Sequence, residues 1–379
     1  MVTERPVRPL RVVFCWAEVS GYAAACWQSL ARVPGVDLHV IHPERLLNRP
    51  NPFDVAPLLA GVSNEMFDTA APHVDRYLLN AVASRDPDVV VLCGWIYWPY
   101  TRLVNAPALR RARKILGMDT PWRGTLAQRF ARLRLSHFMS HMDLVVTAGE
   151  RSGEYARRIG VPDARLRSGF YGFDYRTFAE AASRRPAPWP RQFLFAGRYV
   201  PAKDIGTLIA GYEIYRRSVA HPWGLTCCGA GPEGSRLQGV EGVTDVGFTQ
   251  PRNAPDLFSQ HGALVLPSRF EPWGVVIAEA SAAGLPVICS SACGAASDLV
   301  RSYFNGVVVP SETPAALARA MRWIHERESE LPEIGRRGQS LAAAFSAESW
   351  AVRWHNYLIE AVDASDAAER THIPPPCAE

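Results

Sequence analysis

Short apolar runs alternate with helical stretches along most of the chain, a pattern typical of parallel sheets covered by helices. In the first half these runs predict strands at 10–15, 36–41, 88–93, 113–117 and 143–147, with helices at 22–32, 74–84 and 125–142. In the second half they predict strands at 192–196, 224–228, 243–246, 262–267, 286–289 and 306–309, with helices at 204–218, 234–239, 252–260 and 274–283 and from 314 to about 362. The chain is therefore predicted to form two doubly wound α/β domains, with ligands at the carboxyl ends of their strands.

A proline-rich segment separates the two series. Pro186, Pro188 and Pro190 exclude both a helix and a central strand, so residues 183–191 are predicted to be a linker. The expected organisation has a first Rossmann-like domain over 1–182, a second over 192–345, a helix over 346–365 and a disordered tail over 366–379.

The composition is that of an ordinary globular protein, with 379 residues of which 48% are hydrophobic and 21% charged. No apolar run reaches the roughly 18 to 20 residues of a membrane span, and the N-terminus lacks the apolar core of a signal peptide. The eight cysteines lack zinc-site spacing and are expected to be buried in a protein of the reducing cytoplasm. A net charge of +4 gives no indication of nucleic-acid binding.

The helix predicted at 274–283 is almost entirely apolar, yet it contains Glu279. Burying an ionised carboxylate without a partner costs roughly several kcal/mol. Glu279 is therefore predicted either to reach the rim of the helix or to meet a polar group from outside the chain. Glu271 lies just ahead of the helix start, where free backbone N–H groups bind anions. Two carboxylates beside a helix N-terminus indicate a ligand with hydroxyl and phosphate groups.

A second candidate is the turn after the strand at 192–196, which contains Gly197, Arg198 and Lys203. Glycine at a strand end lets a ligand approach the backbone, and two cations suit a diphosphate. Only two of the 41 basic residues are lysines, Lys114 and Lys203, which favours a specific role for a retained lysine. The alternative is a charged, solvated turn.

Three weaker patterns concern the ends of other strands. Gly229 and Gly231 join a strand to a helix and are candidates to seat a base or ribose, although such turns are common. Gly21 follows the first strand without the three glycines of a dinucleotide site. Asp119 follows the strand at 113–117, where it either faces substrate or caps the next helix.

Two patterns that resemble metal sites are read as structural. Asp86 and Asp88 flank a proline just before a buried strand, where such residues form ordinary turns. His137 and His141 are four residues apart on a predicted helix but lack a third ligand nearby, so they are read as surface residues. No metal site is therefore predicted.

Four segments together resemble the retaining glycosyltransferases of the family-4 type, which have the GT-B fold. They are the Gly-Arg…Lys segment at 193–209, the Gly-x-Gly-Pro turn at 228–232, two glutamates separated by seven residues within 266–280, and Asn305-Gly306. The resemblance implies an acceptor-binding first domain and a nucleotide-sugar-binding second domain that face each other across a cleft. It also implies that the C-terminal helix packs back on the first domain.

The resemblance also implies residue roles. Glu279 would bind the ribose hydroxyls of the donor, and Glu271 would bind the donor sugar. Arg198 and Lys203 would neutralise the leaving diphosphate in place of a metal ion. The donor site would further comprise Gly197, Gly229, Gly231 and the backbone of Trp273, Gly274 and Val275, whereas Gly21 and Asp119 would lie on the acceptor side. No cofactor is implied beyond the donor, a nucleotide-diphosphate sugar, and the acceptor would be a saccharide, a lipid-linked saccharide or a small molecule.

Departures from the family pattern leave alternatives open. Asp298 stands where the family often has glutamate, and the first loop has the single glycine Gly21. A nucleotide-sugar epimerase of the same fold and a non-catalytic nucleotide-sugar-binding protein therefore remain alternatives to a hexosyl- or related glycosyltransferase.

A weak peripheral contact with a membrane is also considered. Arg129, Arg132 and Arg134 lie on the predicted helix that also carries Leu126, Phe130 and Leu133. A solvated basic face is the favoured alternative for this helix.

Overall fold

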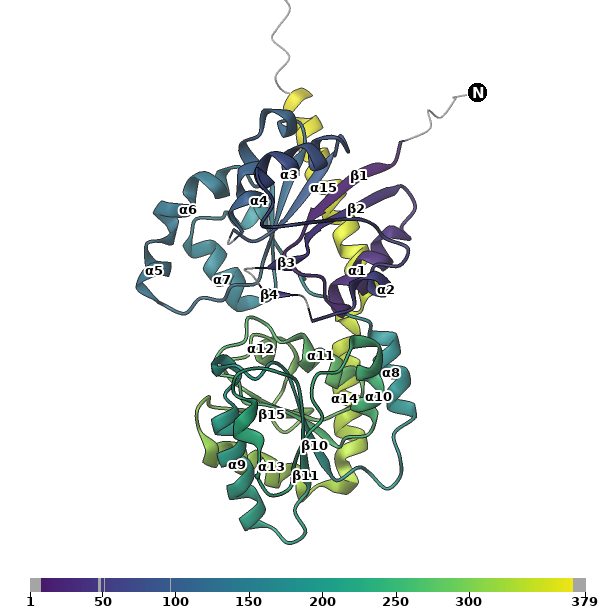
Figure 1. Cartoon of the computed structure of the whole chain (residues 1–379), viewed down its shortest axis with the longest axis vertical. Coiled ribbons are helices and arrows are strands. Elements are labelled where there is room, and N and C mark those ends of the chain that lie inside the picture. Colours follow the sequence, from purple (N-terminus) through teal and green to yellow (C-terminus); the bar gives the residue numbers. More distant parts are fainter. Residues whose placement is uncertain (1–7, 47–48, 51, 96, 371–379) are drawn as a thin grey trace, which may run out of the picture. The chain divides into compact units, whose positions relative to one another are not determined.

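The computed structural model describes residues 8–46, 49–50, 52–95 and 97–370. They form two compact units (Figure 1). Unit 1 comprises the chain up to Thr147, Ser152–Phe170 and the chain from Glu348 onward, and unit 2 comprises Ala148–Arg151 and Tyr171–Ala347.

Unit 1 is built on a seven-stranded parallel sheet. Its strands, in spatial order, are β5 (Ser63–Phe67), β2 (Val36–Pro43), β1 (Leu10–Cys15), β6 (Val89–Cys93), β7 (Arg113–Met118), β8 (Leu144–Thr147) and β9 (Leu166–Ser168). The central strands are apolar along their length because helices cover both faces of the sheet. The edge strands β5 and β9 were not predicted, because they are short and largely polar.

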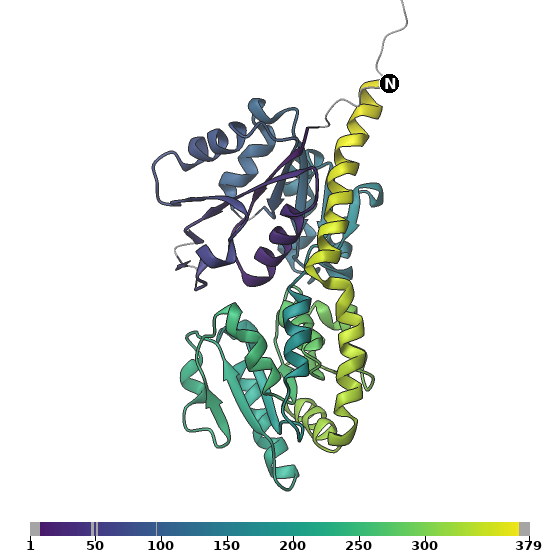
Figure 2. The ribbon, with the colours of Figure 1, turned by 90° about the vertical axis from the view of Figure 1, so that its right-hand side faces the viewer.

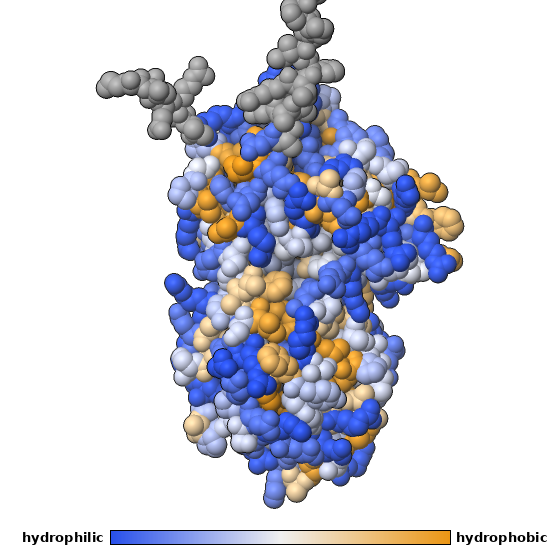
Figure 3. Space-filling model, turned by 180° about the vertical axis from the view of Figure 1, so that it is seen from behind, coloured by the Kyte–Doolittle hydropathy of each residue, from blue (hydrophilic) through white to orange (hydrophobic). Residues whose placement is uncertain are grey.

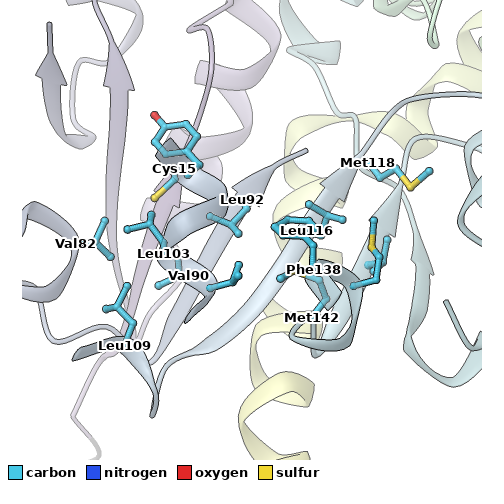
Figure 4. Packing of buried hydrophobic residues seen from close by; sticks show 14 of the residues in the cluster. Cys15, Val82, Val90, Leu92, Leu103, Leu109, Leu116, Met118, Phe138 and Met142 are labelled. Carbon is cyan, nitrogen blue, oxygen red and sulfur yellow. The ribbon is translucent and has the colours of Figure 1, made fainter. Parts of the chain in front are cut away.

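Helices pack on this sheet and enclose the core of unit 1. They are α1 (Gly21–Ala31), α2 (Val55–Leu58), α3 (Val74–Ala83), α4 (Trp98–Arg102), α5 (Leu126–Arg129), α6 (Ala131–Ser140), the part of α7 (Glu150–Arg158) from Ser152, and α15 (Ala347–Arg370). Figure 4 shows Val82 and Phe138 packed with strand residues such as Val90 and Leu116. The single helix expected over 125–142 is wrong in detail, because Phe130 ends α5 and begins α6.

The C-terminal helix α15 belongs to unit 1 from Glu348, as the resemblance implied. Trp350 and Trp354 are buried against Phe14 of β1, with ring centroids 6.3 and 5.5 Å apart. Figure 2 shows the helix running along one side of this unit. The helix continues to Arg370, so residues 366–370 of the expected tail are helical, and residues 371–379 lie outside the described chain.

Unit 2 contains a six-stranded parallel sheet. Its strands, in spatial order, are β12 (Val243–Asp245), β11 (Gly224–Cys228), β10 (Gln192–Ala196), β13 (Ala263–Leu266), β14 (Val287–Ser290) and β15 (Gly306–Val309). Its helices are α8 (Tyr175–Ser183), α9 (Ile205–Ser218), α10 (Ala254–Ser259), α11 (Val275–Ala282), α12 (Ala295–Leu299), α13 (Pro314–His325) and α14 (Leu331–Ala342). The chain order reverses between β10 and β13, which is the point where doubly wound sheets bind ligands.

The boundary between the units differs from the one expected at 182. Helix α8 packs in unit 2, where Phe178 meets Phe258 of α10 with ring centroids 5.3 Å apart. The expected linker at 183–191 is also anchored there, since Arg185 donates to the Ala283 carbonyl at 2.7 Å and Trp189 to the Gly262 carbonyl at 3.0 Å. Prolines exclude regular structure from this segment, but they do not prevent it from packing.

Candidate functional site

The N-terminus of α11 is open to a ligand. The helix follows β13 through a loop that ends at Gly274, which has a φ of 99°. No side chain caps the helix, so the N–H groups of its first turn are available to an anion. A Cβ atom at Gly274 would lie 3.0 Å from Cγ of Glu271. Glycine is therefore required here by the backbone conformation and by the nearness of Glu271.

Lys203 and Glu271 form an ion pair beside this helix end. Lys203 ends the turn after β10 and Glu271 lies in the loop after β13, and their side chains are only 13% and 12% exposed. The two loops are held together because the Ala202 carbonyl accepts from the N–H groups of Arg269 and Phe270 at 2.9 and 3.1 Å. The structure thus brings together two of the three residues that the sequence assigned to catalysis.

Asp204 fixes the position of Lys203 from the following residue. Its side chain accepts from the Thr207 N–H at 3.1 Å and so caps α9, and it pairs with Arg269 at 3.0 Å. The backbone of Asp204 is left-handed, with a φ of 57°. Lys203 is therefore held at a rigid turn and not on a mobile loop.

The site carries more positive charge than its own carboxylate neutralises. Burial lowers the pKa of Lys203 to about 8; Cys293 opposes this shift and Arg198 adds to it. The adjacent Glu271 carboxylate favours the protonated ammonium. Arg198 is exposed and has no carboxylate partner among the described residues. One fixed and one free cation therefore lie close together at the end of β10.

The Glu279 side chain reaches the rim of α11, which is the first of the two alternatives predicted from the sequence. Its side chain is partly exposed and finds no hydrogen-bond or ion-pair partner within the described chain. Burial raises the pKa of Glu279 to about 7, and the nearby Asp174 adds to the shift. The carboxylate is thus available to a polar group from outside the chain.

Gly229 and Gly231 have a packing role that the sequence did not indicate. A Cβ atom at Gly229 would lie 1.9 Å from the Gly197 carbonyl oxygen, and one at Gly231 would lie 2.3 Å from that of Tyr199. These glycines let the loop after β11 lie against the loop after β10, where Gly197 donates to the Cys228 carbonyl at 2.9 Å. Their expected contact with a base or ribose stays a prediction.

Trp273 offers the site only its backbone, because its indole points into unit 2. The ring is buried, stacks on Tyr171 with centroids 5.5 Å apart, and donates to Asp298 at 2.6 Å. Asp298, whose role the sequence left open, thus holds the Trp273–Val275 segment in place. Burial raises the pKa of Asp298, whereas the bonds from Trp273 and Ser297 lower it.

Gly21 and Asp119 lie in unit 1, each after the carboxyl end of a strand. Gly21 is the first residue of α1, which follows β1, and its neighbour Ser20 caps that helix. Asp119 follows β7 directly but does not cap the next helix, because Thr125 does so by accepting from Gln128 at 3.3 Å. The helix-cap alternative for Asp119 is therefore wrong.

The structural reading of Asp86 and Asp88 agrees with their contacts. Asp86 pairs with Arg11 at 2.7 Å and Asp88 with Arg8 at 2.6 Å. Asn305 is buried and donates to the Leu299 carbonyl at 2.9 Å, so it shapes a turn within unit 2.

The rings of His137 and His141 meet edge to face with centroids 4.7 Å apart, and both residues are at least partly exposed. Among the described residues, no three His, Cys, Asp or Glu side chains gather as metal ligands. None of the described helices is both long and apolar enough to span a membrane.

Comparisons with known proteins find similarity to glycosyltransferases. Residues 180–340 match the model of the family described as Glycosyl transferases group 1. The D-rhamnosyltransferase WbpZ of Pseudomonas aeruginosa is 26% identical over 266 residues, covering 64% of this chain and 66% of that protein. The D-inositol 3-phosphate glycosyltransferase of Salinispora tropica is 29% identical over 216 residues, which cover 52% of this chain and 43% of that protein. The matches thus span less than two thirds of either relative.

Solved structures extend the likeness to nearly the whole fold. Anabaena Alr3699/HepE in complex with UDP has a TM-score of 0.71 at 17% identity, covering 93% of this chain and 100% of that one. Sucrose-phosphate synthase from Thermosynechococcus elongatus has a TM-score of 0.72 at 20% identity, covering 94% and 100%. The chain therefore has the GT-B fold, and its residues 180–340, less than half of its length, are similar to the glycosyl transferases group 1 family.

Proposed function

We propose that this protein is a glycosyltransferase that moves a sugar from a nucleotide-diphosphate donor to an acceptor hydroxyl, with retention of configuration and without a metal ion. The observation that carries the proposal is the arrangement around α11. A buried Lys203–Glu271 pair and the unpaired Arg198 lie at the end of β10, beside a helix N-terminus that no side chain caps. Such a set of cations and N–H groups suits a diphosphate.

In the proposed reaction, the bond between the anomeric carbon and the diphosphate oxygen breaks, and both electrons leave with the diphosphate. Lys203 and Arg198 stabilise the charge that develops there, which is the task that a metal ion performs in other transferases. The acceptor hydroxyl attacks on the face that the diphosphate leaves, and its proton passes to the departing diphosphate. Glu271 is assigned to sugar hydroxyls, because its ion pair with Lys203 holds its carboxylate beside the proposed position of the diphosphate.

Glu279 is assigned to the ribose hydroxyls of the donor, because its carboxylate lacks a partner in the described chain. The backbone of Trp273, Gly274 and Val275 would face the sugar and phosphate. On the acceptor side we place Gly21 and Asp119, which follow β1 and β7 of unit 1. A cytoplasmic location stays an expectation from the cysteine usage.

The donor side is tested first, without knowledge of the acceptor. Nucleotide sugars are screened by thermal shift, since a donor present at 100 times its Kd stabilises the folded protein by about 2.7 kcal/mol. UDP sugars are the natural starting point, because Alr3699/HepE was solved with UDP and with UDP-glucose. Lys203→Ala and Glu279→Ala are each expected to lower donor turnover by at least about tenfold, or about 1.4 kcal/mol. Unchanged turnover in both variants would contradict the proposal.

The remaining features need separate measurements. The anomeric configuration of the product, read by NMR, tests retention, and activity that survives dialysis against a chelator tests metal independence. Conversion of the donor to its epimer without any acceptor would instead favour the epimerase. Binding of donor without transfer or hydrolysis, across a broad acceptor panel, would favour a non-catalytic binding protein.

A further inference from the structure

Two short helices of unit 1 present large apolar side chains to solvent. Leu126 of α5, Phe130 at the junction, and Leu133 of α6 are 72%, 65% and 79% exposed. They are four and then three residues apart along the segment, and Phe130 keeps a right-handed helical backbone where the two helices meet. Figure 3 views the molecule from the side opposite to Figure 1, and orange atoms project beside blue ones at the edge of unit 1 where Figure 1 labels α5.

These exposed side chains are not part of the packing of α6 on its own unit. The helix buries a different set of residues, Ala131, Leu135, Phe138 and Met139, in the core of unit 1. The segment is thus apolar on both sides, one side in the core and the other in solvent. Contiguous exposed apolar surface on a folded protein is typical of an interaction site.

The charge around these residues is positive and is not compensated locally. Arg129, Arg132 and Arg134 are all exposed, and within the described chain none of them pairs with a carboxylate. Arg129 instead donates to the Gly124 carbonyl at 3.2 Å. The sequence contains no acidic residue between Asp119 and Asp143. We call Leu126, Arg129, Phe130, Arg132, Leu133 and Arg134 the α5–α6 patch.

We propose that the α5–α6 patch docks on the surface of an anionic lipid bilayer. Leu126, Phe130 and Leu133 enter the interface between headgroups and acyl chains, while the arginines lie among the headgroup phosphates. A second copy of the chain is a poorer occupant, because it would bring two uncompensated positive surfaces together. Nucleic acid would use the arginines but would leave the three apolar side chains in water.

The test uses the full chain and vesicles of two compositions. One vesicle contains phosphatidylcholine alone, and the other contains in addition about one third phosphatidylglycerol, which supplies the negative surface potential. The bound fraction is measured by flotation at low and at high salt. We expect binding to the anionic vesicles at low salt and its loss at high salt, because salt screens exposed charges.

Two sets of substitutions separate the apolar and the electrostatic contributions. Leu126→Gln, Phe130→Gln and Leu133→Gln together remove the apolar side chains while keeping good helix formers. Arg129→Gln, Arg132→Gln and Arg134→Gln together remove the charge, and we expect each set to weaken partitioning by about one to two orders of magnitude. Circular dichroism checks that each variant remains folded.

Two control substitutions change exposed residues outside the α5–α6 patch. Arg319→Gln removes an exposed arginine of α13 that pairs with no carboxylate in the described chain, and Val352→Gln removes an exposed apolar side chain of α15. Both are expected to bind vesicles like the unchanged protein. Donor-binding thermal shifts are expected to be unchanged in all variants, because no residue of the patch belongs to the proposed donor site.

Three results would overturn the proposal. One is the absence of binding to anionic vesicles at low salt. Another is binding that neither set of substitutions weakens more than the controls do. The third is a protein that does not bind vesicles but instead self-associates, as seen by analytical ultracentrifugation, or binds RNA, in a way that the patch substitutions abolish.

Discussion

Glu279 is a carboxylate whose buried surroundings disfavour its charged form. The pKa of about 7 in the folded protein lies above the ordinary value of 4.5, so the folded state holds this proton more tightly than the unfolded state does. The contribution of Glu279 to stability is therefore greatest at low pH. This contribution to the free energy of unfolding is lost as the pH rises from about 4.5 to about 7. The loss is at most about 3 kcal/mol, because the side chain is partly exposed.

Glu279→Gln is expected to remove this pH dependence. The difference in unfolding free energy between variant and parent should move in favour of the variant between pH 5 and pH 7, since glutamine has no charge to bury. Chemical denaturation at a series of pH values measures it. Donor binding is expected to weaken in the same variant, because glutamine is a poorer acceptor for ribose hydroxyls. A constant difference across this pH range would contradict the assignment of the pKa.

Asp298 is expected to act on the site through Trp273. Asp298→Ala leaves the buried indole N–H without an acceptor, at a cost of about 1 to 3 kcal/mol of stability. Donor turnover should fall as well, because the Trp273–Val275 backbone loses its anchor. The double variant Asp298→Ala/Trp273→Phe removes both partners, and its stability loss is expected to be smaller than the sum of the two single losses. Additive losses would show that the bond does not couple the two residues.

The sequence contains only two lysines, Lys114 and Lys203, and only Lys203 belongs to the candidate donor site. Lys203 pairs with Glu271, whereas Lys114 is buried in unit 1 and donates to the Leu109 carbonyl at 2.7 Å. Composition singled out both equally, and only the fold separates them. Asp298 was visible as a departure from the family pattern, but its bond to Trp273 joins residues 25 positions apart.

At the scale of elements, α11 depends on the left-handed residue that begins it. Gly274→Ala is expected to cost about 1 to 2 kcal/mol of stability, because its φ of 99° is strained for alanine. It should also reduce donor turnover, since the new Cβ would press on Glu271 at 3.0 Å.

Gly239→Ala is the matched control for this substitution. Gly239 has a similar φ of 73°, but a Cβ atom there would have no neighbour within 4 Å. It is expected to lose stability by a similar amount while keeping donor turnover, so equal turnover losses in the two variants would contradict the role of Gly274 in the site.

Most strands could be predicted from the sequence, but two edge strands of unit 1 could not. Central strands such as β1, β6 and β10 lie where the apolar runs predicted them, because a strand covered on both faces is largely apolar. The edge strands β5 and β9 lack that requirement and were missed. The helix expected over 234–239 is a single 3₁₀ turn at Gly234–Leu237.

At the scale of the whole molecule, the last helix stabilises the unit that contains the first strand. Trp354→Ala is expected to destabilise unit 1 by about 3 to 5 kcal/mol, because it empties a fully buried site against Phe14. Amide hydrogen exchange, measured separately for the two units of this variant, should show lower protection of β1 and β6 in unit 1. Protection in β10 and β13 of unit 2, and the donor-induced thermal shift, should change little; an equal loss in both units would contradict this division.

The amino-acid sequence by itself determined the fold class, the approximate centres of both sheets and the choice of Lys203 and Glu271 as candidate site residues. These features follow from local chemistry, since periodic burial and helix-end charge act within a few residues. Only the tertiary structure decided that α8 and the proline-rich segment pack in unit 2. It alone also decided that Gly229 and Gly231 serve loop packing and that Asp298 holds Trp273. The physical reason is that these contacts join residues far apart in the chain, where no local pattern records which surface a segment will cover.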